Sequence, residues 1–368
     1  MGGKALSEPS PRLSTPRLLQ LAGSVFSVLK DAFPDLRAQA IPWYAEKPDH
    51  GDLDILVAAG PSYDPDALAR ALGAVEVFHN GTVSSIGLQV PEGVFQVDLV
   101  SVEPRSYDFA MSYFAYNDMG NLLGRVAHKM GFKLGHLGLS YVLRDPDKDT
   151  LVIDEIMITR SWSEALRLLG YNPAIYQTAV ARGGFRDLES IFRYVTSSPY
   201  VNRDIYLLEN RNQKARARDS KRKTYSEFLA WVEQAEEVPA FDWSNKELVR
   251  RSALSQARAC FPDFAEAMDA ASARALQHAA ARRRFNGAVV AKITGLTGVE
   301  LGAVMKEVRS GFRSEDDLTR WALSATSADI EQRVRKCHVA ISVDATESSV
   351  ASSAPASKRV SPSFTIRN

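Results

Sequence analysis

Three aspartates in two apolar segments are the residues of this chain whose types and spacing could do chemistry. Asp52 and Asp54 lie in residues 51–57, where a turn-forming glycine leads into an aliphatic run that predicts a buried strand. Side chains alternate between the two faces of a strand, so both carboxylates point the same way. Asp98 stands alone in a second apolar run, residues 94–102, where a single carboxylate is costly unless it is paired or metal-bound. If the two strands are neighbours, all three carboxylates converge on one face.

The ligand types indicate which ion such a face would hold. All three donors are carboxylate oxygens, which Mg²⁺ prefers, and Mn²⁺ can substitute for it. Zinc is disfavoured because Cys260, Cys337 and the six histidines show no ligand spacing. We therefore expect two Mg²⁺ ions at Asp52, Asp54 and Asp98. The alternative is that each acid is a solvated residue at the surface of its strand.

The segments around these strands are typical of an α+β protein. Apolar residues at helical spacing predict a helix over residues 16–33, and a second helix is expected over residues 64–72. Strands are expected over residues 74–78 and 82–90, before the strand that carries the third aspartate. A hairpin is expected over residues 139–159. The predicted fold is thus a mixed sheet with helices on one face, followed by an all-α C-terminal domain.

Glycines at residues 183 and 184 predict a hinge, beyond which the pattern is almost wholly helical. The first and last segments are rich in small and polar residues, which favours disorder. The expected parts are a disordered tail (1–15), a catalytic domain (16–112), a segment with a nucleotide-binding helix, a hairpin and a closing helix (113–182), a basic helical domain that binds nucleic acid (183–341) and a second disordered tail (342–368).

Length and composition exclude several classes of protein. With 368 residues and 45% hydrophobic content, the chain can bury a sizeable core. It contains no apolar run near 18 residues, and its first residues lack a signal-peptide core, so we expect a cytoplasmic protein that does not enter membranes. The sequence leaves the oligomeric state open.

The net charge of +1 hides an uneven distribution. The first 180 residues carry 15 Lys and Arg against 21 Asp and Glu, whereas the remainder carries 30 against 23. An acidic front half suits a metal site, and a basic back half suits a polyanion. The densest basic run, residues 211–223, could contact nucleic-acid phosphates, although such runs are also found as solvated helices or linkers. Its cations are Arg211, Lys214, Arg216, Arg218, Lys221, Arg222 and Lys223.

The order of these motifs resembles the DNA polymerase β nucleotidyltransferase superfamily, and most closely the catalytic part of the family X polymerases. The likeness spans roughly residues 16–180. It implies a palm domain that transfers a nucleoside monophosphate from an NTP to a hydroxyl, with Asp52 and Asp54 bridging two metal ions and Asp98 ligating the ion that activates the hydroxyl. The motifs that carry the likeness are Gly51-Asp52-Leu53-Asp54, Val97-Asp98-Leu99, Tyr113-Phe114 and a helix bearing Asp118, Asn121 and Arg125.

The resemblance also implies where the nucleotide binds. Asp118, Asn121 and Arg125 would lie near the incoming base and the growing strand. Asn121 and Arg125 are four residues apart and share one face of a predicted helix, for which the alternative is exposure to solvent. The family's Gly-Ser pair, which holds the triphosphate, is replaced here by residues 41–45. We therefore expect phosphate binding to rest on other groups, for instance Lys47, or to be of low affinity.

The back half resembles different relatives. Residues 285–305 are similar to the helix-turn-helix near the end of CCA-adding enzymes and bacterial poly(A) polymerases, and the whole arrangement is similar to nucleotidyltransferases of some bacterial viruses. These likenesses favour an NTP substrate and an RNA 3′ end of tRNA-like form. One alternative is a family X-like DNA polymerase that fills gaps with dNTPs. A second is a degenerate head that only binds nucleic acid, through residues 211–223.

Overall fold

The computed structural model describes residues 3–61, 63–145 and 147–352, with the backbone alone for residue 149 and residues 343–352. The chain forms two compact units. The first comprises the residues up to Leu143 together with Asp154–Met268, and the second comprises Arg144–Ile153 together with the residues from Asp269 onward. Residue 183, where the sequence predicts a domain boundary, lies inside the first unit.

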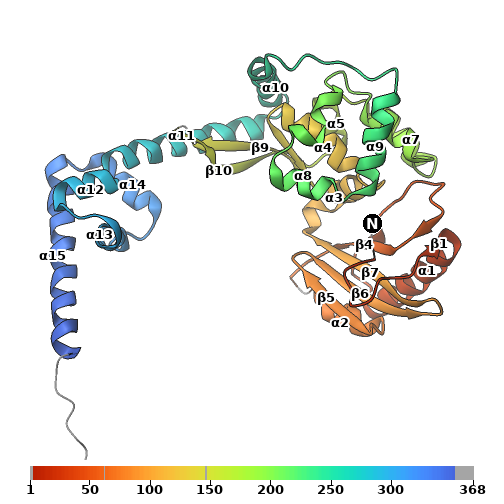
Figure 1. Ribbon diagram of the computed structural model, residues 1–368, viewed down its shortest axis with the longest axis horizontal. Coiled ribbons are helices and arrows are strands. Elements are labelled where there is room, and N and C mark those ends of the chain that lie inside the picture. Colours follow the sequence, from red (N-terminus) through yellow and green to blue (C-terminus); the bar gives the residue numbers. More distant parts are fainter. Residues whose placement is uncertain (1–2, 62, 146, 353–368) are drawn as a thin grey trace, which may run out of the picture. The chain divides into compact units, whose positions relative to one another are not determined.

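A mixed five-stranded sheet forms the N-terminal part of the first unit (Figure 1). Its two central strands, β4 and β7, run parallel, and the other neighbouring strands are antiparallel. The predicted mixed sheet is thus confirmed. In spatial order the strands are β2 (Ala38–Ala40), β4 (Asp52–Ala58), β7 (Gly93–Val102), β6 (Val83–Val90) and β5 (Glu76–Asn80).

Helices cover both faces of this sheet. On one face α1 (Thr15–Ala32) and α2 (Pro65–Ala71) share a core with the apolar side chains of β4 and β7, such as Ile55 and Leu99. The helix α3 (Tyr107–Phe114) packs on the opposite face. The prediction that helices cover one face alone is therefore wrong. Leu56 and the other apolar residues at the far end of the opposite face also need a cover, and α3 supplies it.

The N-terminal segment, predicted to be a disordered tail over residues 1–15, is ordered from residue 3. Its end forms β1 (Leu13–Ser14), which pairs antiparallel with β3 (Asp49–His50). Leu6 and Leu13 are buried, so this segment contributes apolar surface that the composition-based prediction overlooked.

The remainder of the first unit follows the predicted order of elements. The helix expected to bind nucleotide is α4 (Met119–Lys129), and the three-stranded sheet behind it contains the predicted hairpin, although the tip of that hairpin belongs to the second unit. That sheet contains β8 (Phe132–Gly135), β9 (Gly138–Asp145) and β10 (Lys148–Thr159), and the following helices are α5 (Trp162–Leu168), α6 (Pro173–Ala181), α7 (Leu188–Val195), α8 (Gln213–Asp219), α9 (Lys223–Gln234) and α10 (Lys246–Cys260).

The second unit is a helical bundle, as predicted for the C-terminal part. Gly295, with φ of 74°, ends one helix, and the next begins at Gly298, so the expected helix-turn-helix is present. Its helices are α12 (Gly287–Thr294), α13 (Gly298–Ser310), α14 (Glu315–Ser324) and α15 (Ser327–Ser352), and they follow the long helix α11 (Pro262–Arg284). Disorder from residue 342 is wrong up to Ser352, because α15 continues to that residue; residues 353–368 lie outside the described part. Within the described ranges, the helices lack the combination of length and apolar character needed to cross a membrane.

Gly87 allows the N-terminal segment to lie against the sheet, which makes a clear prediction. A Cβ at this position would come within 2.7 Å of Val94 Cγ1 and 3.2 Å of Leu6 Cδ1. We expect Gly87→Ala to lower the free energy of unfolding by about 1–3 kcal/mol, because one of these side chains must move. Chemical denaturation measures the change.

Gly23→Ala is the matched control. Gly23 lies on the exposed side of α1, and nothing lies within 4 Å of the position of its added Cβ. A helical alanine there should stabilise the protein by about 0.5–1 kcal/mol. Equal effects of the two substitutions would contradict the close packing at Gly87.

Candidate functional site

The parallel pairing of β4 with β7 brings the three predicted acids together. Asp54 lies directly opposite Asp98, and Asp52 lies opposite Gln96. One ligand oxygen from each of the three aspartates lies within 4.8 Å of the others. In the part of the chain that the structure describes, these three aspartates are the one set of acidic, His or Cys side chains that lie closely enough together to share an ion. The predicted convergence of the carboxylates on one face is therefore confirmed.

Electrostatics disfavour full ionisation of this group when no cation is present. Burial and the neighbouring charges of Asp52 and Asp98 raise the pKa of Asp54 to about 8, although part of its side chain still reaches solvent. Burial also raises the pKa of Asp98, against the opposing effect of hydrogen bonds from Ser85 and Gln96. A compact set of oxygen donors that repel one another fits a divalent ion of the Mg²⁺ or Mn²⁺ type.

Lys47 lies near these carboxylates, in the loop that precedes them. Burial lowers the pKa of this half-buried lysine, while the charges of Asp52 and Asp54 act in the opposite direction. The loop is held in place by backbone hydrogen bonds: the Ile41 amide donates to the Asp54 carbonyl oxygen at 2.9 Å, and the Ala45 amide donates to that of Phe185 at 2.8 Å. Lys47 is thus a cation close to the acids, on a loop that is tied to β4 and to Phe185.

Sequence reasoning missed one polar residue of this site, Gln96. Its amide nitrogen donates to both oxygens of Asp98, at 2.9 and 3.0 Å, and its side chain is 3% exposed. The signal was available, because residues two apart on a strand share a face and Asp98 marks the polar one. Glutamine was passed over because it is neither a charged group nor a usual metal ligand.

The three residues predicted to bind nucleotide, which lie on α4 and at its N-cap, differ from one another in burial and in contacts. Arg125 is 8% exposed and its Nε donates to the Ile205 carbonyl oxygen at 3.1 Å, while burial and Arg211 lower its pKa to about 10. It therefore lies in the interior and not on an open face. Asp118 forms an ion pair with Arg222, and the Asn121 side-chain oxygen accepts a hydrogen bond from Arg218 at 3.3 Å.

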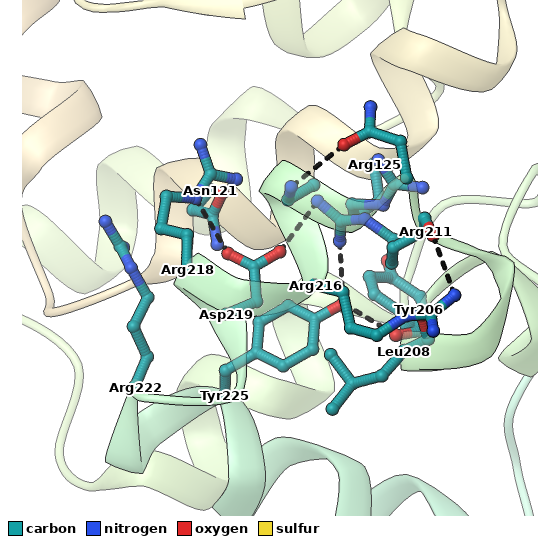
Figure 2. A network of polar contacts seen from close by, with 12 residues as sticks. Asn121, Arg125, Tyr206, Leu208, Arg211, Arg216, Arg218, Asp219, Arg222 and Tyr225 are labelled. Atoms are coloured by element: carbon teal, nitrogen blue, oxygen red, sulfur yellow. Dashed lines mark hydrogen bonds and ion pairs between the residues drawn. The ribbon is translucent and has the colours of Figure 1, made fainter.

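The predicted nucleic-acid-binding run folds back onto α4, as Figure 2 shows. Arg211 is buried and pairs at 2.7 Å with Asp219, whose side chain is fully buried; Arg218 pairs with the same carboxylate at 2.9 Å. Arg216 donates to backbone carbonyls, including that of Leu208 at 3.0 Å. Arg211 therefore lies in the interior, whereas Arg216, Arg218 and Arg222 contact groups within the protein but still reach solvent. Contact of these three with nucleic acid stays a prediction. Lys214, Lys221 and Lys223 stay exposed, and so do Arg216 and Arg218, whereas Arg222 is half-buried.

The reason for this arrangement is the aspartate inside the basic run. A buried arginine is stable only with a partner, and Asp219 supplies the charge that lets Arg211 enter the interior. Arg211 also donates to the Tyr225 hydroxyl at 2.9 Å, and that hydroxyl donates to the Tyr206 carbonyl oxygen at 2.6 Å (Figure 2). The run therefore joins α8 and α9 to α4.

No protein-family model matches this sequence, and a search of curated proteins gives no match.

The raised pKa of Asp54 predicts a pH-dependent stability. Between the ordinary value of 3.8 and about 8, the folded protein binds a proton that the unfolded chain does not. Stability in EDTA should therefore fall as the pH rises through this window, by roughly 2–4 °C in Tm for each kcal/mol lost. Thermal unfolding from pH 5 to 9 tests this expectation.

Asp54→Asn is the control for the pH series. It removes the titrating group, so its Tm should fall less than that of the wild type as the pH rises. The difference in Tm between the two proteins should therefore widen. Added Mg²⁺ should stabilise the wild type more at pH 8 than at pH 5, since a bound ion replaces the proton. A constant difference across the series would contradict the assigned electrostatics.

The buried ion pair predicts a structural role for Arg211. Asp219→Asn leaves a buried guanidinium without its counter-charge, so we expect a loss of about 3–5 kcal/mol in the free energy of unfolding. Lys223→Gln changes an exposed lysine that lies 3.5 Å from Glu227, and should cost less than about 0.5 kcal/mol. Denaturant titration of both variants gives the comparison. Equal losses of unfolding free energy in the two variants would contradict the structural role of Arg211.

Proposed function

We propose that this protein is a nucleotidyltransferase that transfers a nucleoside monophosphate from an NTP to the 3′ hydroxyl of a nucleic acid. The observation that carries the proposal is the pairing of β4 with β7, which gathers Asp52, Asp54 and Asp98 into one set of oxygen donors. Three converging carboxylates are what a two-metal phosphoryl-transfer site requires. The mixed sheet that bears them is consistent with a palm domain.

Asp52, Asp54 and Asp98 would hold the two Mg²⁺ ions. When bound, these ions supply the positive charge that activates the attacking hydroxyl and stabilises the leaving pyrophosphate. The chain's own residues do the positioning. Lys47 stands near the acids on a loop tied to the Asp54 carbonyl and to Phe185, so its ammonium can bind the triphosphate in a fixed place.

Asn121 and Arg218 bear on where the nucleotide base would bind. In the proposed reaction, the side-chain oxygen of Asn121 would exchange its hydrogen bond from Arg218 for one from the nucleotide. Arg125 would act from the interior, by holding α4 against the Ile205 backbone. We therefore assign direct nucleotide contact to Asn121 and Asp118, and a supporting role to Arg125.

The acceptor we favour is an RNA 3′ end of tRNA-like form. The support is the helix-turn-helix of α12 and α13, whose sequence resembles that of CCA-adding enzymes. Gap filling in DNA with dNTPs is the alternative, and it rests on the resemblance to family X polymerases. A protein that binds nucleic acid without catalysing a reaction is less well supported, because most arginines in residues 211–223 form ion pairs within the protein.

Asp98→Ala tests the proposal directly. Loss of one of three carboxylates should lower the rate of nucleotide incorporation at least about 100-fold, because bound metal contributes several kcal/mol of transition-state stabilisation. The assay uses purified protein, Mg²⁺, each labelled NTP or dNTP, and two acceptors: a tRNA-like 3′ end and a gapped DNA duplex.

Asp108→Ala is the matched control, since Asp108 is an exposed aspartate that forms an ion pair with Arg37. Its incorporation rate should stay within about twofold of the wild type, as expected for a surface ion pair. Undiminished incorporation by Asp98→Ala would refute the assignment, and wild-type activity on gapped DNA alone would refute the RNA acceptor.

A further inference from the structure

The N-terminal arm, defined here as residues 3–10, crosses the sheet beside the three carboxylates. Leu6 is buried against Gly87 of β6, and the Ser7 amide donates to Glu76 of β5 at 2.7 Å. Gly87 lies opposite Gln96 in the sheet register, so the arm occupies the same face as the acids. The first residues of the arm also reach β4, because the position of a Cβ on Gly3 lies 2.4 Å from the Gly51 carbonyl oxygen.

Gln96 connects this arm to the metal centre. Its side-chain oxygen accepts a hydrogen bond from the Ala5 amide at 2.8 Å, and its side-chain nitrogen donates to both oxygens of Asp98. Its backbone amide donates to the Ser10 hydroxyl at 3.0 Å. A glutamine amide has one accepting end and one donating end, so the arm and the carboxylate are held by opposite ends of one rigid group.

The orientation of this amide matters because the carboxylates repel one another. Ser85 also donates to Asp98, but Gln96 is the group that holds both of its oxygens. Without Gln96 the Asp98 side chain is less restrained and can rotate away from Asp54 and Asp52, which removes the third ligand from the set. Gln96 is almost completely buried, so turning its amide would bring its oxygen toward the carboxylate and leave the Ala5 amide without its partner. The contact from Ala5 thus favours the one orientation in which Gln96 donates to Asp98.

We propose that Gln96 is a positioning residue of the metal centre and that the N-terminal arm, through the Ala5 amide, sets its orientation. The inference rests on the metal-binding part of the proposed function. Its consequence is that an N-terminal arm with no ligand of its own determines how tightly the ion binds. Groups that hold metal ligands in place typically affect metal affinity by about 10–100-fold.

The test is the affinity of full-length protein for Mn²⁺ alone, measured by electron paramagnetic resonance of the free ion. Gln96→Met keeps the length of the side chain but removes its hydrogen bonds with Ala5 and Asp98, and should weaken binding by about 10-fold or more. Ala5→Pro removes only the backbone donor of the arm, and should weaken binding in the same direction. In the double variant Ala5→Pro should have no further effect, because the arm acts through Gln96.

Ser7→Pro is the matched control. It removes a backbone donor from the same arm, but that donor contacts Glu76 and not Gln96. Mn²⁺ affinity should stay within about twofold of the wild type, so that a general loosening of the arm is separated from loss of the specific contact. Thermal unfolding of each variant verifies that it is folded. Wild-type affinity in Ala5→Pro, or an Ala5→Pro effect that adds in full to that of Gln96→Met, would overturn the inference.

Nucleotide incorporation, measured in parallel, separates this inference from the proposed function. A wild type that binds Mn²⁺ with the predicted dependence on Ala5 but transfers no nucleotide would refute the enzyme and support the positioning role. A wild type that transfers nucleotide while Ala5→Pro keeps full Mn²⁺ affinity would refute the positioning role alone. Absence of Mn²⁺ binding by the wild type would refute both.

Discussion

The parallel register of β4 and β7 is the constraint on which the rest of this structure depends. A shift of one residue would turn either Asp54 or Asp98 to the other face and separate the carboxylates. The register is fixed by burial on both sides: α1 and α2 cover one face, and α3 covers the far end of the other. The hydrophobic core thus forces together three like charges that would otherwise move apart.

Much of this arrangement could be predicted from the sequence. Two strands, one around Asp52 and one around Asp98, have apolar residues at regular spacing with an acid at a defined position among them. Such local patterns indicate which face of a strand is buried, so they can be recognised in the sequence. Their proximity depended on the strands being neighbours, which the motif order suggested. The contact between the N-terminal arm and Gln96 could not be found in this way, because a hydrogen bond between Ala5 and Gln96 spans 91 positions and leaves no periodic trace.

The basic run shows what charge counting leaves out. Seven cations in residues 211–223 favour a polyanion partner to the extent that their side chains reach solvent and are not already paired. A single acid, Asp219, compensates both Arg211, which is buried, and Arg218, which is exposed. The pairing of Arg222 with Asp118 extends the same compensation to α4. Composition records the sum of the charges but not which of them are already neutralised by the fold.

The position of the N-terminal arm has a practical consequence for the preparation of this protein. Gly3 lies next to the Gly51 carbonyl oxygen, directly before the strand that begins with Asp52, so a tag fused to the N-terminus is attached close to the carboxylates. A polyhistidine tag there would bring imidazoles within reach of the carboxylates and would itself capture divalent ions. Purification handles therefore belong elsewhere in the chain, or should be cleaved before metal affinity is measured.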